Sequence, residues 1–175
     1  MTKKLGRVNK YRYLWIDVTH NCNLRCQYCD NYIREKSPLD VDRIFRNAVN
    51  AVKRYSDKDV RFNISGGEPV LYPKLQELLD IINQSSCHGV TLYSNGLKTL
   101  PNFQKEGKEN FIHTSFHLDY PKSYKTIVQN VEKTGMPCIY NILVKEFDEY
   151  PNFKELEEVL DKIRDQYIHT YPVYL

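Results

Sequence analysis

The stretch CNLRCQYC at residues 22–29 holds three of the chain's five cysteines, in the spacing C-x3-C-x2-C. Three thiolates in one short loop suit a metal centre that keeps one coordination position open, as a catalytic centre does and a structural one does not. The thiol spacing is compatible with two centres. One is zinc, with His20 or Asp30 as the fourth ligand, and the other is a [4Fe-4S] cluster with one iron left free.

The composition predicts one globular domain. The 175 residues are 41% hydrophobic and 27% charged, with a net charge of +3, which is ordinary for a globular protein. No apolar run approaches the roughly 20 residues that span a bilayer, and no apolar segment follows the basic N-terminus as it would in a secretory signal. We therefore expect a cytoplasmic protein with a solvated arm at residues 1–11, no membrane partner and no nucleic-acid partner.

The two remaining cysteines, Cys87 and Cys138, lie far from the clustered three and from each other. In the reducing cytoplasm, clustered cysteines indicate metal binding or redox chemistry and not a disulfide framework. For isolated cysteines such as these two, we predict buried structural thiols.

Segments of strand-like composition alternate with segments of helical periodicity. Aromatic and β-branched residues predict strands at 13–19, 60–65, 90–94, 111–116, 137–144 and 167–174. Apolar stripes predict helices at 41–52, 75–82, 124–131 and 153–163. Asp40 is a candidate N-cap of the first helix, Pro73 can open the second, and Gly135 can close the third. The polar stretch 98–109 predicts an irregular loop or a poor helix.

This alternation predicts a parallel sheet, because helical crossovers bring each strand back in the same direction. Six such units fall short of an eight-stranded barrel, so we expect an open doubly wound sheet or a partial, curved barrel. In both folds, ligands bind at the C-terminal ends of the strands. The special loops all follow strands and would meet at that rim: the cysteine loop, Gly66-Gly67-Glu68-Pro69, Ser94-Asn95-Gly96, Ser115-Phe116-His117 and Lys145-Glu146.

The Gly-Gly-Glu-Pro motif at residues 66–69 is the second candidate site. Paired glycines let the backbone approach a ligand closely, and Glu68 with the local backbone carbonyls could hold a cationic amino group. A bare zinc site gives no reason for this arrangement. The structural alternative is a tight turn with an exposed glutamate.

Together, CNLRCQYC at 22–29 and SGGEP at 65–69 resemble the two motifs of the radical S-adenosylmethionine (SAM) superfamily. The resemblance implies a partial (βα)6 TIM-like barrel, with residues 1–175 as a single core domain. It implies that Cys22, Cys26 and Cys29 hold a [4Fe-4S] cluster whose unique iron is chelated by SAM. It also implies an oxygen-sensitive enzyme that takes an electron from a donor such as flavodoxin or ferredoxin. The cluster would then cleave SAM to methionine and a 5′-deoxyadenosyl radical that removes hydrogen from a substrate.

The resemblance also assigns the cofactor-binding residues. Those expected to contact SAM are Tyr28, Gly66, Gly67, Glu68, Pro69, Ser94, Asn95, Ser115 and Asn141, with the backbone near 171–173. The glycine motif would bind the amino group, Ser94, Asn95 and Ser115 the carboxylate or ribose, and Tyr28 and Asn141 would lie near the adenine. His117 is the catalytic candidate, by contact with SAM or substrate or by proton delivery. Lys145 is a weaker candidate of the same kind, and for both the alternative is a structural role.

The substrate is not predicted. The chain has no cysteine-rich C-terminal extension for further clusters, so we expect a compact, single-cluster member. A peptide, a partner protein or a second subunit would close the open side of the barrel. The alternatives are a zinc-bound interaction module without catalysis, a small activating enzyme, and a deazapurine-forming enzyme, which Cys29-Asp30 faintly resembles.

Overall fold

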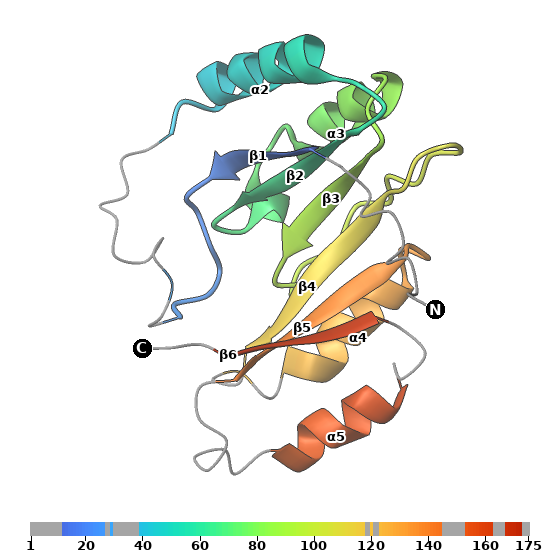
Figure 1. Cartoon of the computed structure of the whole chain (residues 1–175). Helices are drawn as coiled ribbons and strands as arrows, with labels where there is room; N and C mark the ends of the chain where they lie inside the picture. Colours follow the sequence, from blue (N-terminus) through green and yellow to red (C-terminus); the bar gives the residue numbers. More distant parts are fainter. Residues whose placement is uncertain are drawn as a thin grey trace, which may run out of the picture.

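The computed structural model describes residues 12–26, 29, 39–117, 120, 123–144, 153–162 and 167–172. The arm expected at residues 1–11 lies outside this part. The described strands are β1 Arg12–Thr19, β2 Val60–Gly66, β3 Gly89–Ser94, β4 Phe111–His117, β5 Cys138–Val144 and β6 Tyr167–Pro172 (Figure 1). The described helices are α2 Val41–Tyr55, the short 3-10 helix η1 Pro69–Leu71, α3 Leu75–Gln84, α4 Tyr124–Glu132 and α5 Phe153–Lys162.

The six strands form one sheet in the order β1-β2-β3-β4-β5-β6, and every neighbouring pair is parallel. A doubly wound sheet reverses its strand order at a switch point, and this sheet does not. Strands β1 and β6 are at opposite edges, so the barrel is partial and open (Figure 1). The predicted α/β class and partial (βα)6 barrel are confirmed, and the doubly wound alternative is wrong.

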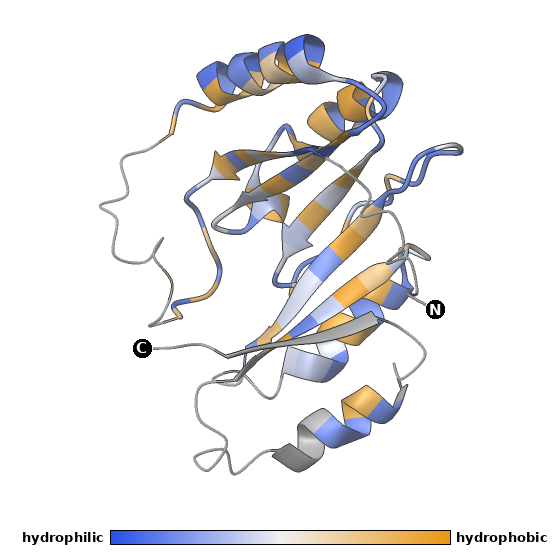
Figure 2. Cartoon of the chain, viewed as in Figure 1, coloured by the Kyte–Doolittle hydropathy of each residue, from blue (hydrophilic) through white to orange (hydrophobic). Residues whose placement is uncertain are grey.

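The helix-covered face of the sheet carries the hydrophobic core. Every second residue of β2, β3 and β4 on this face is fully buried: Phe62, Ile64, Val90, Leu92, Ile112 and Phe116. Apolar stripes on α3 and α4 pack against them. Figure 2 shows these helices and strands with alternating apolar and polar bands. Because strand side chains alternate, the intervening residues line the opposite, concave face of the barrel. No helix in the described part of the chain combines the length and apolar character needed to cross a membrane.

Two of the three residues that we predicted to begin or end a helix do so in the structure. Asp40 caps α2, since its carboxylate accepts a hydrogen bond from the backbone N–H of Arg43 at 2.9 Å. Gly135 follows α4 with a φ of +63°, the left-handed conformation that ends helices without strain in glycine. Pro73 does not open α3, which begins at Leu75. Instead, a 3-10 turn forms first at Pro69–Leu71, and Pro73 falls in the turn between the two.

The segment 98–109 is an irregular loop, as one of its two predictions had it, and the alternative of a poor helix is wrong. Asn110 fixes its end to the sheet, because its Oδ1 accepts from Val90 N at 3.0 Å while its Nδ2 donates to Phe103 O at 2.7 Å. Cys87 and Cys138 are both buried in the core, as expected. Burial raises the pKa of the Cys138 thiol to about 12, so this thiol stays protonated.

A charged cluster closes the N-terminal end of the concave face. The buried guanidinium of Arg61 donates to Glu109 Oε2 at 2.9 Å and lies over the ring of Phe111, 4.5 Å from its centroid. Glu109 also contacts His88 Nε2 at 2.8 Å. The hydrogen bond from His88, reinforced by both positive partners, lowers the pKa of Glu109.

We predict that Glu109→Gln destabilises the fold by about 1 kcal/mol, because the buried Arg61 guanidinium loses its charged acceptor but keeps the backbone oxygen of residue 109, and the Glu109 side chain is itself 63% exposed. Urea unfolding at pH 7 measures the change. The matched control is Glu106→Gln, an exposed glutamate in the same segment, which should leave the unfolding free energy within about 0.5 kcal/mol. Equal stability of the two variants would contradict this role of Glu109.

Candidate active site

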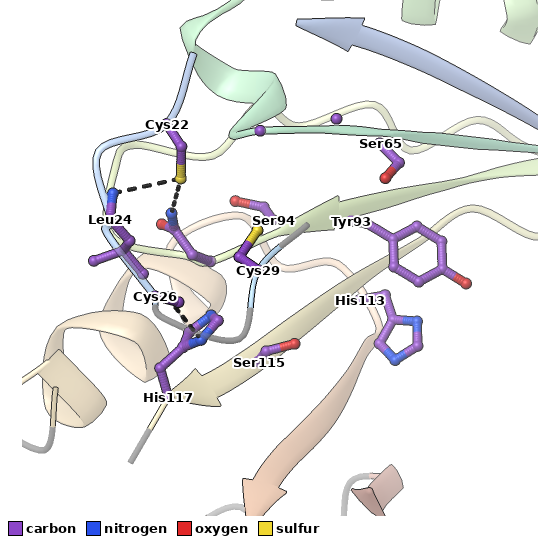
Figure 3. A pocket seen from close by; sticks show the side chains of 13 residues that line it. Cys22, Leu24, Cys26, Cys29, Ser65, Tyr93, Ser94, His113, Ser115 and His117 are labelled. Carbon is purple, nitrogen blue, oxygen red and sulfur yellow. Dashed lines mark hydrogen bonds between the residues drawn. The ribbon is translucent and has the colours of Figure 1, made fainter. Parts of the chain in front are cut away.

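A cavity of about 220 Å³ lies at the C-terminal ends of the strands, with the cysteine loop as one wall (Figure 3). Cys22, Cys26 and Cys29 all line it, so the structure brings the three predicted metal ligands to one place. The opposite walls come from the ends of β2, β3 and β4. This agrees with the general position of ligand sites in parallel α/β folds.

The glycine motif binds directly to the start of the cysteine loop. Gly67 N donates to Thr19 O at 2.6 Å, and Glu68 N donates to Asn21 O at 2.7 Å. A Cβ atom on Gly66 would lie 2.3 Å from Thr19 O, and one on Gly67 would lie 2.3 Å from Asn21 O. The two glycines are therefore required for a close approach of backbone to backbone, in addition to lining the cavity.

Glu68 lies behind the cavity wall. Its side chain is 0% exposed, so the alternative of a tight turn with an exposed glutamate is wrong. The carboxylate accepts from Ser94 Oγ and from Asn95 N, both at 2.7 Å, and from Val70 N at 3.3 Å. Burial raises the pKa of Glu68, and these three hydrogen bonds oppose the rise. Glu68 thus ties the end of β2 to the end of β3.

The loop after β3 in turn holds the cysteine loop. Asn95 Nδ2 donates to Asn23 Oδ1 at 2.8 Å and lies 3.9 Å from Cys22 Sγ. Cys22 Sγ also accepts from Leu24 N at 3.4 Å. The chain of contacts therefore runs from Glu68 through Asn95 to the first cysteine.

The end of β4 supports the other half of the loop. His117 Nδ1 lies 3.5 Å from Cys26 Sγ (Figure 3). Just beyond the strand, the hydroxyl of Tyr120 accepts from Arg25 N at 3.3 Å. The cysteine loop is thus held by the ends of β2, β3 and β4, each through different residues.

The structure places the predicted SAM-binding residues in three groups. Those that line the cavity are Gly66, Gly67, Ser94, Asn95, Ser115 and His117. Glu68 and Pro69 do not line it and are buried beside it. Asn141 lies beside Ser115 in the register of β4 and β5 and is also buried, outside the lining. Tyr28, Asp30, Lys145 and Val173 lie outside the described residues.

Sequence reasoning missed two lining residues, Tyr93 and His113, whose rings contact each other at a tilt with centroids 4.4 Å apart. The alternation of side chains along the predicted strands could have identified both residues. His113 is two residues before Ser115 on β4, and Tyr93 is two residues before Asn95 at the end of β3. Side chains two apart on a strand share a face.

The cavity wall suits thiolate ligands. N–H donors are directed at Cys22 Sγ, and hydrogen bonds to ligand sulfurs are a means by which proteins stabilise and tune iron–sulfur clusters. Outside the lining, Asn141 Oδ1 is a buried acceptor that has no partner among the described residues. His20, the proposed fourth ligand of the zinc alternative, lines a different cavity with Thr19 and Tyr72. Cys22, Cys26 and Cys29 share one cavity, but their side chains are not grouped closely enough to hold a metal ion, and no other three His, Cys, Asp or Glu side chains of the described residues are either.

A partial parallel barrel with a three-cysteine loop at its strand ends defines a class of cofactor-dependent enzymes. The sequence model of the Radical SAM superfamily matches residues 16–171 of this chain. The chain therefore belongs to the radical SAM superfamily, whose members are enzymes that use a [4Fe-4S] cluster and SAM. This confirms the resemblance drawn from the two motifs.

Two curated relatives and one solved structure are similar to this chain. A probable GTP 3',8-cyclase of Methanocaldococcus jannaschii is 26% identical over 94% of this chain and 58% of its own length. A 7-carboxy-7-deazaguanine synthase of Haemophilus influenzae is 29% identical over 84% of this chain and 61% of its own length. The chain thus spans about three fifths of these relatives. The structure of anSMEcpe with bound AdoMet and Cp18Cys peptide matches with a TM-score of 0.65 at 15% identity, covering 92% of this chain and 50% of that one, which shows the shared fold.

We predict that Gly67→Ala lowers both the unfolding temperature and the iron content after anaerobic reconstitution. The added Cβ would lie 2.3 Å from Asn21 O and would push the cysteine loop from the end of β2. Gly107→Ala is the control, because its Cβ would meet nothing within 4 Å, although its φ of +75° adds strain. If both variants bind the same amount of iron, the close approach at Gly67 does not position the loop.

We predict that Glu68→Gln removes a pH dependence of stability. Because burial raises the pKa of Glu68 in the folded state, its contribution is greatest below the unfolded pKa of about 4.3 and declines as the pH rises to the folded pKa. A glutamine would not titrate, and its amide would lose an acceptor for Ser94 or Asn95, at a cost of about 1–3 kcal/mol. Urea unfolding between pH 4 and 7 tests this, with Glu77→Gln on the exposed side of α3 as control. Identical pH profiles for Glu68→Gln and the wild type would refute it.

Proposed function

We propose that this protein is a radical SAM enzyme in which Cys22, Cys26 and Cys29 hold the [4Fe-4S] cluster. The single observation that carries the proposal is that all three thiols line one cavity with the backbone of Gly66 and Gly67. When bound, the cluster supplies the electron that cleaves SAM to methionine and a 5′-deoxyadenosyl radical, which removes hydrogen from a substrate. The protein contributes the binding, orientation and exclusion of water that such chemistry needs.

The residues of the cavity wall have separate roles in this proposal. The backbone of Gly66 and Gly67 faces the cavity and offers carbonyl acceptors to the amino group of SAM, while Glu68 and Pro69 act from behind by fixing that backbone. Ser115 supplies a hydroxyl for the carboxylate or ribose. Asn141 Oδ1, buried without a described partner, is the acceptor for an adenine N–H.

Ser94 and Asn95 line the cavity, but their polar groups are already engaged. Ser94 Oγ donates to Glu68 and accepts from Gly96 N at 3.0 Å. Asn95 reaches Asn23 with its amide. In this proposal both hold the cysteine loop and the glycine motif in register, and their contacts with SAM are secondary.

His117 remains the candidate for contact with SAM or substrate. Its Nδ1 lies 3.5 Å from Cys26 Sγ, which adds a second role in this proposal. A ring N–H donated to a ligand sulfur would stabilise the added negative charge of a reduced cluster. Tyr28 keeps its proposed role from the cysteine motif alone, and Lys145 keeps its own from its position after the fifth predicted strand.

The cysteines support a cytoplasmic setting for this proposal. All five are free, which fits a reducing, cytoplasmic compartment and an oxygen-sensitive cluster. A flavodoxin or ferredoxin would supply the electron. The open side between β1 and β6 leaves room for a peptide or partner protein to complete the barrel, within a single core domain.

A small-molecule substrate is the second candidate. The names of the two sequence relatives refer to a GTP cyclase and a deazaguanine synthase. A substrate with a purine-like ring would therefore be similar to the compounds that appear in the names of those relatives.

We predict that Cys26→Ala abolishes both cluster binding and SAM cleavage, because two thiolates remain where three are needed. Anaerobically reconstituted, reduced protein is assayed for bound iron and for 5′-deoxyadenosine. Cys87→Ala is the control, since Cys87 is buried in the core outside the cavity, and it should keep both properties. Full activity of Cys26→Ala, or zinc with no deoxyadenosine in the wild type, would refute the proposed function.

A further inference from the structure

Three rings form a row across the concave face. Trp15 on β1 and Tyr93 on β3 have centroids 4.7 Å apart, and Tyr93 and His113 on β4 have centroids 4.4 Å apart. Trp15 and Tyr93 come from strands on either side of β2, so their rings meet above it. Tyr93 and His113 line the cysteine cavity on one side of the row and a second cavity on the other.

The second cavity has a volume of about 400 Å³ and continues from the row toward the N-terminal ends of the strands. Its walls are largely aromatic, with Tyr13, Trp15 and Phe111 among the lining residues. The Trp15 side chain is 57% exposed although it belongs to a cavity wall. An indole with an open face in a cavity is suited to stacking against another flat ring.

Asn63 supplies the polar group of this cavity. It lines the cavity and is 2% exposed, and its Oδ1 has no hydrogen-bond partner among the described residues. Buried polar atoms in proteins are normally paired, and an exception calls for an explanation. A ligand that donates an N–H to this oxygen provides one.

The charge of the cavity is already neutralised. Arg61 is the one lysine or arginine among the lining residues, and it is bound to Glu109 through both a side-chain and a backbone acceptor. Its guanidinium also covers the ring of Phe111. The described wall therefore offers aromatic faces and an amide acceptor, and not a site for a phosphate or carboxylate.

We propose that this second cavity binds a planar nitrogen heterocycle of the purine or pterin type, stacked on Trp15 with a ring N–H donated to Asn63 Oδ1. Because the cavity meets the cysteine cavity at Tyr93 and His113, the ring is the substrate on which the proposed radical chemistry acts. That catalytic role rests on the proposed function, whereas the binding itself does not.

The sole tryptophan of the chain is Trp15, so its fluorescence reports on this site directly. Anaerobically reconstituted protein is titrated with guanosine, with excitation at the red edge of tryptophan absorption, and we expect saturable quenching. Calorimetric titrations with guanosine and with neopterin distinguish a purine from a pterin. Ribose 5-phosphate, which lacks the ring, should give neither quenching nor heat. An absence of saturable binding by both ring compounds overturns the proposal.

Asn63→Leu separates binding from stability. The leucine removes the unpaired Oδ1 and keeps a side chain of similar size, so we expect an unchanged or higher unfolding temperature and at least tenfold weaker binding. A structural asparagine would give the reverse, with lower stability and unchanged affinity, and that result would overturn the proposal.

Trp15→Leu, followed by calorimetry, should also weaken binding at least tenfold. Tyr55→Leu is the matched control, because Tyr55 is an exposed aromatic residue on α2 outside the cavity, and its affinity should equal that of the wild type. Equal affinity of Trp15→Leu and wild type overturns the stacking. If the ring compound binds but SAM is not cleaved, the ring site stands and the proposed function is wrong. If SAM is cleaved but no ring compound binds, the proposed function stands and the ring site is wrong.

Discussion

Two backbone hydrogen bonds join the glycine motif to the cysteine loop, from Gly67 N to Thr19 O and from Glu68 N to Asn21 O. They continue the parallel pairing of β1 and β2 past the ends of the strands. Any side chain at position 66 or 67 would keep the two backbones apart. The motif therefore joins two backbone segments of the protein itself, in addition to the proposed role of its carbonyl groups in binding a cofactor.

Glu68 connects the glycine motif to the end of β3. A buried carboxylate without partners would be costly, and here three donors from η1 and the end of β3 satisfy it. Asn95 then carries the connection to Asn23 and Cys22. Each of these residues satisfies hydrogen-bonding groups of the next, and the apolar side chains of α3 and α4 pack against the other face of the sheet.

Much of this fold was predictable from local sequence patterns. The helix from Asp40 and the turn at Gly135 follow from short-range rules, and the alternation of strands with helices determines a parallel sheet. Residues 22–29 and 65–69 identify the site through their spacing. The orientation of Glu68 was not predictable, because it depends on Ser94 and Asn95, about 26 residues away in the chain. The ring row was missed for the same reason, since Trp15 and Tyr93 meet across an intervening strand.

The residues that contact the cysteine loop from β3 and β4 lie much later in the sequence. Asn95 lies 73 residues beyond Cys22, His117 lies 91 residues beyond Cys26, and Tyr120 lies 95 residues beyond Arg25. Contacts over such separations form only after the intervening chain has folded. During synthesis the thiols emerge first, while the groups that position them emerge after more than half of the chain. On the proposed role of these thiols as iron ligands, β1 to β4 would assemble before iron is inserted, and the nascent cysteines would depend on a reducing environment during that interval.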